Sequence, residues 1–384
     1  MKILHVITSL KIGGAESALY NFLEKTINDG NTHSVAFFYD GPNVSRIKKL
    51  GIPVFKVKGL FFKYDLVAYV RLKNLIKKIK PDIIHSALWS ANFLSRLIAN
   101  KLKIPVICDL HSNFTFDGKL RGWLEKFIVN KADKYVAVSS TAKDGFVKTV
   151  LNNIKDKNVQ KELNSKIVLI QNGIDVDAIQ KKASGKNISK QDLGFKQNDF
   201  IVGAVGRLDP IKSYDLLIRS FALFFKKITN SNKAVKLCIV GDGSERLKLE
   251  ELANNLGITS CVKFVGQRTD THNFYPLFDC FVLSSVSEGL SIALLEALSF
   301  GLPIITTHRG LKHDVIVDAQ NGFLVPVEDE IALARRLEEL YLNSEISKKM
   351  RAANLELVKT KFDISRTVDD YKEIYFELTS RRSW

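Results

Sequence analysis

The sequence has little of what marks secreted, membrane-spanning or metal-binding proteins. It contains only four cysteines in 384 residues, scattered and without a C-x-x-C pair. We expect them to be small core residues of a protein in a reducing compartment, which predicts a cytoplasmic location. No apolar run approaches the ~20 residues of a membrane helix. The short apolar stretch Ile3–Leu10 leads into a Gly-Gly-Ala-Glu turn, which favours a buried first strand over a signal peptide.

Acidic residues are scarce in the first half of the chain. The net charge is +16, and residues 1–180 hold 28 Lys and Arg against 15 Asp and Glu, whereas the remaining residues hold 29 against 26. A basic half of this kind indicates an anionic partner, either a membrane surface or a nucleic acid. The sequence has no recognisable nucleic-acid-binding motif, so a basic nucleic-acid-binding protein is kept only as an alternative.

The chain has room for two domains, each with its own hydrophobic core. Apolar strand patterns alternate with helix patterns from residue 3 onward, which is typical of α/β domains with parallel sheets. The stretch 181–198 is polar and poor in large apolar residues, and it predicts the connector between the domains. The first strand is not followed by a G-x-G-x-x-G fingerprint, so NAD binding is not expected.

The stretch 282–306 carries the main functional signal. An apolar strand runs into a Ser/Gly turn that holds Glu288, and a helix pattern that contains Glu296 follows. At ~1.5 Å rise per residue the two acids lie on the order of 10 Å apart, too far for the ~5–5.5 Å pair of a retaining glycosidase. The helix N-terminus between them favours an anion. An acid, an anion site and a second acid follow one another, which suits a nucleotide sugar, a ligand with polar groups on either side of a diphosphate. The alternative is that Glu288 simply complements the helix dipole and that Glu296 is an exposed helical acid.

The E-G-L-S-I-A-L-L-E run resembles the E-x7-E signature of the retaining glycosyltransferases of family 4. The resemblance implies an α/β protein of the GT-B fold, with two Rossmann-like α/β/α domains facing across an interdomain cleft. It implies an acceptor-side domain over residues 1–180, a linker over 181–198 and a nucleotide-sugar-binding domain over 199–362. A C-terminal helix, about 363–384, is expected to pack back on the first domain. The run N-G-I-D at 172–175 resembles the segment ahead of the family's linker.

A second motif opens the predicted second domain. Gly206, Arg207 and Leu208 follow an apolar strand, and Lys212 comes five residues after the arginine. Arginine as a bidentate fork and lysine as a point charge can together clamp a diphosphate. The run resembles the family's G-R-L-x-x-x-K-G element, with Ser213 where glycine is usual. The resemblance implies donor binding by Gly206 and catalysis by Arg207 and Lys212.

The resemblance also assigns roles outside these two motifs. It implies that Glu288 and His111 act in catalysis, with His111 contacting the donor sugar near the reacting carbon, and His111 is favoured over His85. The further donor-binding positions that it implies are Gly13, Gly14, Arg268, Gly289, Leu290, Ser291 and Glu296, and it places Glu16 on the acceptor side.

The function expected from the resemblance is transfer of a hexosyl unit from a nucleotide diphosphate sugar, with UDP as the nucleotide, to a glycan or lipid-linked saccharide. The reaction would retain the anomeric configuration and serve cell-surface polysaccharide, lipopolysaccharide or glycan-precursor biosynthesis. A sugar-nucleotide epimerase of the same fold is the alternative among enzymes. The D-x-D at 175–177 matches the metal site of a different glycosyltransferase fold, and no His/Asp cluster accompanies it. We therefore expect neither a metal nor another cofactor.

The basic excess is densest between Arg46 and Lys80, where eleven basic residues face one acid. A helix pattern over 65–79 carries Arg71, Lys73, Lys77 and Lys78, and Phe61 and Phe62 precede it. Two interpretations are open: an ordinary solvated helix face, or a surface that docks on anionic headgroups with the phenylalanines as apolar wedges. The second predicts a protein bound peripherally at the cytoplasmic face of a membrane.

Overall fold

The computed structural model describes residues 1–59, 66–111, 119–185, 188–228, 233–307 and 315–380. The chain divides into two compact units, the first comprising Met1–Gly173 with Ile364–Trp384 and the second Ile174–Asp363. Each unit is an α/β domain built on a parallel sheet, which confirms the predicted fold class.

Within the described residues, the first unit has a seven-stranded sheet in the order β3-β2-β1-β4-β5-β6-β7, with every neighbouring pair parallel. The chain moves outward from β1 in one direction and from β4 in the other, so the order reverses between these two strands. The strands are β1 (Lys2–Ser9), β2 (Thr32–Tyr39), β3 (Val54–Lys56), β4 (Ile83–Ala87), β5 (Val106–Leu110), β6 (Lys134–Ala137) and β7 (Ile167–Leu169).

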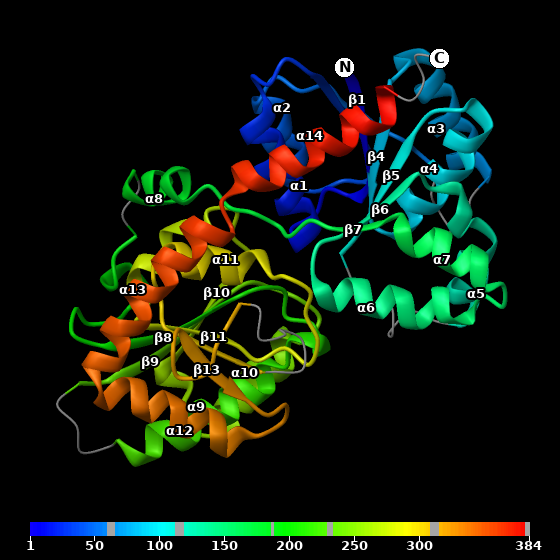
Figure 1. Cartoon of the computed structure of the whole chain (residues 1–384). Helices are drawn as coiled ribbons and strands as arrows, with labels where there is room; N and C mark the ends of the chain where they lie inside the picture. The colour runs from blue at the N-terminus through cyan, green and yellow to red at the C-terminus, as the bar shows by residue number, and fades with distance from the viewer. Residues whose placement is uncertain (60–65, 112–118, 186–187, 229–232, 308–314, 381–384) are drawn as a thin grey trace. The chain divides into compact units, whose positions relative to one another are not determined.

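Helices cover both faces of this sheet (Figure 1). They are α1 (Gly14–Thr26), α2 (Asn43–Lys49), α3 (Leu66–Ile79), α4 (Trp89–Leu102), α5 (Lys119–Ile128), α6 (Ser140–Thr149), α7 (Lys157–Ser165) and α14 (Ile364–Ser380). The central strands are buried on both faces, so most of their residues are apolar, and the polar ones among them, such as His5, His85 and Asp109, are buried too.

Helix α14 returns to the first unit after the whole second unit and packs beside α1, where Figure 1 draws it in red. Its buried residues Tyr371, Ile374, Tyr375 and Leu378 recur at the three- and four-residue spacing of one helix face. At its start the chain passes so close to Gly173 that a Cβ there would lie 2.6 Å from the Ile364 Cα. A glycine is therefore required at position 173.

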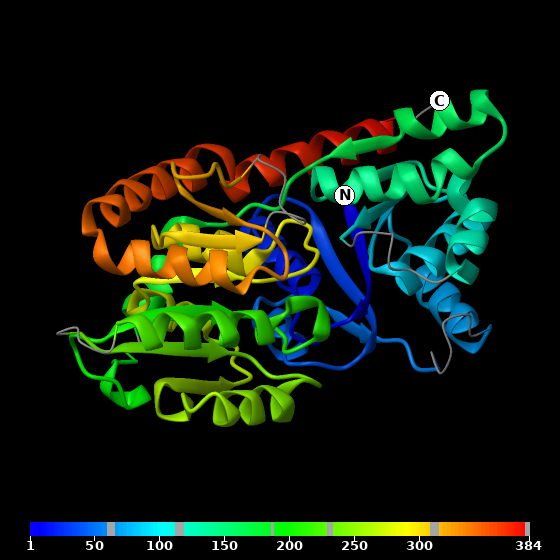
Figure 2. The same ribbon diagram turned by 90° about the horizontal axis from the view of Figure 1, so that it is seen from below.

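The second unit has a six-stranded parallel sheet among its described residues, in the order β10-β9-β8-β11-β12-β13. Here the order reverses between β8 and β11. The strands are β8 (Phe200–Val205), β9 (Val235–Val240), β10 (Val262–Gly266), β11 (Cys280–Leu283), β12 (Ile304–Thr307) and β13 (Gly322–Val325). The helices are α8 (Val176–Ser184), α9 (Tyr214–Lys227), α10 (Arg246–Asn255), α11 (Ile292–Ser299), α12 (Glu330–Leu342) and α13 (Ser344–Lys361). Figure 2 shows these strands layered with the helices.

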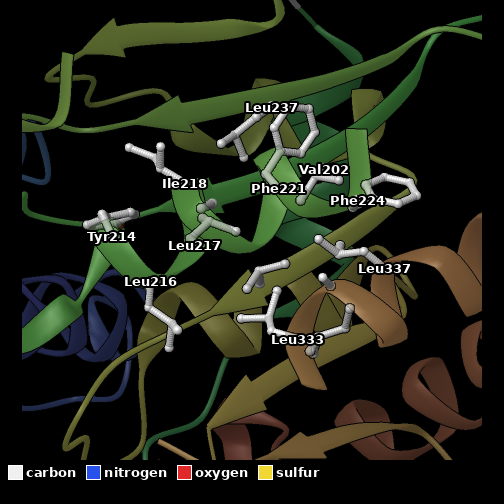
Figure 3. Close-up of a cluster of buried hydrophobic side chains, with 14 of the residues drawn as sticks. Val202, Tyr214, Leu216, Leu217, Ile218, Phe221, Phe224, Leu237, Leu333 and Leu337 are labelled. Atoms are coloured by element: carbon white, nitrogen blue, oxygen red, sulfur yellow. The ribbon is translucent and has the colours of Figure 1, made fainter. Parts of the chain in front are cut away.

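The core of the second unit lies where α9 packs on the sheet. Figure 3 shows Leu217 and Phe221 of α9 packed against Val202 and Leu237 of the strands. Helix α12 contributes Leu333 and Leu337 to the same cluster. These side chains are all fully buried. This packing fixes α9 on the sheet, and with it the loop between β8 and α9 that carries Arg207 and Lys212.

The change from the first unit to the second falls at Gly173–Ile174, earlier than the predicted connector at 181–198. Residues 181–184 end α8, and 191–193 form a short 3-10 helix, so the described part of that polar stretch lies within the second unit. Among the described helices, none combines the length and the apolar character needed to cross a membrane.

Candidate functional site

The candidate site of the second unit lies where its strand order reverses. The loops 206–212 and 284–291 leave the carboxyl ends of β8 and β11, which are neighbours in the sheet. In open parallel sheets, ligands bind in the crevice at this reversal point. The two loops are tied together, because the Val286 amide donates to the Ile211 carbonyl at 2.9 Å and the Ser284 hydroxyl donates to the Lys212 carbonyl at 2.9 Å.

Lys212 and Glu288, one from each loop, form an ion pair. Their side chains are 18% and 15% exposed, so the pair is largely shielded but still reachable from solvent. The Ser285 hydroxyl donates to the same carboxylate at 2.8 Å. The structure thus brings together two of the residues that the sequence assigned to catalysis, although 76 positions separate them.

Arg207 is more exposed than Lys212. Its side chain is 61% exposed and pairs with Asp209 at 3.0 Å. Gly206, immediately before it, faces the buried Tyr214, because a Cβ at position 206 would lie 2.8 Å from the tyrosine hydroxyl. Burial raises the pKa of Tyr214, and the charges of Glu288 and Asp209 raise it further, so the hydroxyl stays protonated.

Glu296 lies in the middle of α11. Its carboxylate accepts hydrogen bonds from the Tyr275 hydroxyl at 2.6 Å and from the Thr271 hydroxyl at 3.3 Å. Burial raises the pKa of Tyr275, and the charge of Glu296 adds to this. Gly289, Leu290 and Ser291 lead into α11, with Ser291 at its N-cap.

Arg268 has a protein partner that sequence reasoning did not anticipate. Its guanidinium makes two hydrogen bonds to Asp270, at 2.7 and 2.8 Å, and lies over the Phe274 ring. Because the forked group is engaged by a carboxylate two residues away, this arginine is held against its own loop.

In the first unit the strand order reverses between β1 and β4. Gly13 and Gly14 lie in the turn after β1 and begin α1, and Glu16 falls in the first turn of that helix. The Glu16 carboxylate is buried and accepts a hydrogen bond from Ser9 at the end of β1. A Cβ at Gly13 would collide with this carboxylate, so the Gly-Gly turn and the buried acid depend on each other.

His111 follows β5 and lies beside a buried histidine–aspartate cluster. Its Nε2 is 3.6 Å from the Asp109 Oδ2, and its side chain is 10% exposed. His85 Nε2 lies 2.8 Å from the same oxygen. Burial would raise the pKa of Asp109, but the neighbouring histidines, His85 first, outweigh it and hold the pKa well below its usual range. A cavity lined by His5, His85, Asp109 and His111 opens here.

Helix α14 supplies two residues of this cluster. The Tyr371 hydroxyl donates to the Asp109 Oδ1 at 2.9 Å, and the Tyr375 hydroxyl lies 2.7 Å from the His85 Nδ1. Sequence reasoning missed both tyrosines, because 262 and 290 positions separate them from their partners. The apolar–aromatic spacing of α14 was the one available signal, and it marks a buried face without naming what that face contacts.

The predicted membrane-facing residues fall on and before α3. Arg71, Lys77 and Lys78 are exposed, and Lys73 is partly exposed. Phe61 and Phe62 lie outside the described residues. On the same helix Leu66, Val67 and Val70 are exposed at 73%, 47% and 47%, an apolar group that sequence reasoning did not single out.

The D-x-D run lies at a helix start. Asp175 is the N-cap of α8 and accepts from the Ala178 amide at 3.0 Å, so a capping function accounts for this carboxylate.

Comparison with known proteins is consistent with this geometry. The model "Glycosyltransferase Family 4" matches residues 12–178, and "Glycosyl transferases group 1" matches residues 185–356. The UDP-Gal:alpha-D-GlcNAc-diphosphoundecaprenol alpha-1,3-galactosyltransferase of Escherichia coli is 27% identical over 328 residues, 82% of this chain and 80% of its own.

A second relative spans nearly the whole chain. It is the GalNAc-alpha-(1->4)-GalNAc-alpha-(1->3)-diNAcBac-PP-undecaprenol alpha-1,4-N-acetyl-D-galactosaminyltransferase of Campylobacter jejuni, 27% identical over 391 residues, which are 98% of this chain and 99% of its own. Among solved structures, Anabaena HepE in complex with UDP-glucose shares the fold with a TM-score of 0.84 at 20% identity, covering 98% of this chain and 100% of that one. Because the two family models fall one on each unit and together span most of the sequence, the chain belongs to the glycosyltransferases of family 4, with the GT-B fold.

Proposed function

We propose that the protein transfers a hexosyl unit from a UDP-sugar to a lipid-linked saccharide or glycan, with retention of anomeric configuration. The observation that carries the proposal is the Lys212–Glu288 pair at the strand-order reversal of the second unit, with Arg207 on the same loop. A cluster of two cations and an acid at this edge of a parallel sheet matches a ligand with a diphosphate next to a sugar.

The proposed chemistry is chiefly electrostatic. Negative charge develops on the departing diphosphate, and Lys212 and Arg207 stabilise it together with the amides of 289–291 that lead into α11. Glu288 binds the Lys212 ammonium and turns its remaining oxygen sites toward sugar hydroxyls. Glu296, anchored by Tyr275, keeps acceptor sites for the ribose hydroxyls, because an ionised carboxylate has about four lone-pair positions.

Retention follows if the acceptor attacks from the face that the leaving group departs from. The bond from the anomeric carbon to the diphosphate oxygen breaks as the bond to the acceptor oxygen forms, and the leaving phosphate takes the acceptor's proton. In this proposal His111 contacts the donor sugar near the reacting carbon. No metal or other cofactor takes part, so transfer should continue in EDTA.

The names of the relatives support the substrate classes. The Escherichia coli enzyme is named for UDP-galactose and a diphosphoundecaprenol acceptor, and the Campylobacter jejuni enzyme for a PP-undecaprenol acceptor. HepE was solved with UDP-glucose. We extend these classes to this chain: a UDP-sugar as donor and a lipid-linked saccharide as acceptor, in the biosynthesis of cell-surface polysaccharide, lipopolysaccharide or a glycan precursor.

A lipid-linked acceptor calls for contact with a membrane, and α3 supplies a surface of matching chemistry. Exposed Leu66, Val67 and Val70 lie on the helix that also carries Arg71 and Lys77. The Lys73 pKa is lowered, first by Lys101 and then by burial and Lys77, which shows that cations crowd together here. We propose that this face docks on anionic headgroups at the cytoplasmic side of a membrane, with its apolar residues entering the interface.

Ligand-induced stabilisation tests the donor assignment. Because a ligand that binds only the folded state raises its stability by mass action, UDP should raise Tm more than GDP or ADP at equal concentration. Transfer from a UDP-sugar to an undecaprenyl-diphosphate saccharide, with EDTA present, should then release UDP and give a product whose anomeric proton coupling matches the donor's. No stabilisation by any nucleotide, or a product of inverted configuration, would contradict the proposal.

A further inference from the structure

Asp109 is a buried carboxylate with both oxygens engaged. It is 7% exposed, its Oδ1 accepts from the Tyr371 hydroxyl at 2.9 Å, and its Oδ2 lies 2.8 Å from the His85 Nε2. A carboxylate taken out of water is costly unless such partners hold it. The lowered pKa of Asp109, set by its histidine neighbours against the effect of burial, means that it stays ionised.

Two contacts fix the orientation of the His85 ring. Burial raises the pKa of Tyr375 well above its usual value, with the charge of Asp109 adding to it, so its hydroxyl stays protonated. It lies 2.7 Å from the His85 Nδ1, and the His85 Nε2 hydrogen points at the ionised Asp109 carboxylate. The Asp109 carboxylate therefore accepts a hydrogen bond from Tyr371 on one oxygen and from His85 on the other.

His111 lies between this buried cluster and the cavity. Its Nε2 faces the Asp109 Oδ2 at 3.6 Å, and its ring lines the cavity. A carboxylate on one side of an imidazole favours the tautomer with its N–H on that side, and so leaves Nδ1 as an acceptor. Among the described residues, ionisable groups near this cluster include His5, whose ring centroid lies 5.2 Å from that of His85, and the two tyrosines of α14. His33 lies behind His5, with its Nδ1 3.0 Å from the His5 Nε2.

We propose that Asp109 is a positioning residue for His111, fixing its ring orientation and tautomer, and that Tyr371 of α14 holds Asp109 for that purpose. The inference rests on the proposed function, in which His111 contacts the donor sugar. It differs from simple support of the fold, because a positioning residue acts only through the residue that it positions. The face of α14 is thereby part of the reaction's apparatus without touching the substrate.

A double-mutant cycle separates these two roles. Asp109→Asn should lower kcat about 10–100-fold, the scale for partners that orient a functional imidazole, with KM for the donor and Kd for UDP nearly unchanged. In a His111→Ala background the same substitution should add almost nothing, because its effect passes through the ring that is gone. Factors that multiply in the double variant would overturn the proposal.

Tyr371→Phe provides the second variant and does not depend on the folding of Asp109→Asn. It removes one hydroxyl and should lower kcat by a smaller factor, again only when His111 is present. The matched control is Tyr135→Phe, which removes a buried hydroxyl bound to Arg96 on the other face of the same sheet. If Tyr371→Phe and Tyr135→Phe behave alike, the α14 tyrosine is not a positioning residue.

A measurement without turnover makes the two possible failures distinguishable. In the nitrogen-15 spectrum of the histidine rings, His111 should be in the Nε2–H tautomer, and Asp109→Asn should move it toward Nδ1–H. An unchanged His111 signal overturns the positioning of the ring. Full activity of His111→Ala instead removes the role proposed for that histidine in transfer and leaves the spectroscopic result to decide the positioning.

Discussion

The two units carry their functional side chains in opposite ways. In the second unit the charged groups Arg207, Lys212 and Glu288 come from two loops at one sheet edge, are partly exposed, and pair with carboxylates or lysines nearby. In the first unit the cluster around Asp109 is buried, its carboxylate is held by histidine and tyrosine side chains, and the tyrosine comes from a helix that follows the entire second unit. The first arrangement suits an anion that arrives and leaves, whereas the second suits a group that must not move.

The largest expected effect is a loss of kcat when the cations of the second unit are removed. Lys212→Ala and Arg207→Ala should each lower kcat by about 10²–10³, the loss expected when one donor to a developing negative charge is removed. Lys227→Ala is the matched control, because Lys227 pairs with Glu338 at 2.9 Å on the surface of α9. Circular dichroism should show all three variants folded. Wild-type kcat in both site variants would show that the loop 206–212 does not stabilise the departing diphosphate.

Charge reversal on α3 tests the difference in charge between the two units. Wild-type protein should co-sediment with anionic vesicles at low salt but not with zwitterionic ones. The triple variant Lys73→Glu, Lys77→Glu, Lys78→Glu should bind at least about 100-fold more weakly, since each lysine near such a surface contributes about 1 kcal/mol.

The matched control for the vesicle experiment reverses three exposed lysines of α13, namely Lys348, Lys349 and Lys359. This variant should sediment like wild type and should keep its affinity for UDP, as should the α3 variant. If the two triple variants sediment alike, net charge alone accounts for the binding and α3 is an ordinary solvated helix face.

Substitutions of Glu288 and Glu296 should have different effects on UDP binding and on transfer. Glu296→Gln should weaken UDP binding about tenfold or more, because a charge-assisted hydrogen bond contributes about 1.5–3 kcal/mol. Glu288→Gln should leave UDP binding nearly unchanged and lower transfer, because Glu288 pairs with Lys212 and, in the proposed function, binds the sugar rather than the nucleotide. Tyr275→Phe removes the hydroxyl that anchors Glu296 and should weaken UDP binding by a smaller factor. Titration calorimetry measures all three, and equal weakening by both acids would contradict the assignment.

The smallest effect concerns pH and the first unit alone. Burial, with the charges of His85 and His33, lowers the pKa of His5 well below 6.5, and burial also lowers the pKa of His33. In the unfolded chain histidines titrate near about 6.5, so below that pH the unfolded state binds more protons and stability is lost as pH falls. From pH 7.5 to 5.5 the free energy of unfolding should drop by about 1 kcal/mol for each histidine that stays neutral.

Tryptophan fluorescence in urea measures this loss selectively, because all three tryptophans fall within the sequence ranges of the first unit. His5→Gln keeps a polar side chain that does not titrate, and it should reduce the pH dependence. A free energy of unfolding that stays constant between the two pH values would show that these histidines become protonated without unfolding.

Sequence reasoning succeeded where the relevant residues are close along the chain. The alternation of apolar strands and helices predicted two parallel-sheet units, and the structure confirms this because each βα unit is a local pattern. The G-R-L-x-x-x-K run spans seven consecutive positions and the E-x7-E run spans nine, so each can be recognised in the sequence alone. Their meeting as Lys212 and Glu288 follows from the rule that neighbouring parallel strands end at the same edge.

The remainder depended on contacts that no local pattern encodes. Tyr371 and Tyr375 read only as the buried face of a helix, and Asp109 as a strand residue, until the fold brings them together. The predicted connector at 181–198 rested on polar composition, yet the change of unit occurs at Ile174, which is buried. Ser213 stands where the resembled element usually has glycine. Its φ of +46° places it in the left-handed region, which glycine adopts without strain and other residues do not.

The position of α14 in the chain also sets the order in which the protein can be completed during synthesis. Residues 174–363 emerge from the ribosome before the helix that pairs with Asp109 and His85. At translation rates of about 5–20 residues per second, this delay lasts on the order of 10–40 s. During that interval the first unit lacks a helix that covers one face of its sheet, so a sheet that forms then leaves apolar surface and the Asp109 carboxylate uncovered. Only the docking of α14 covers this surface.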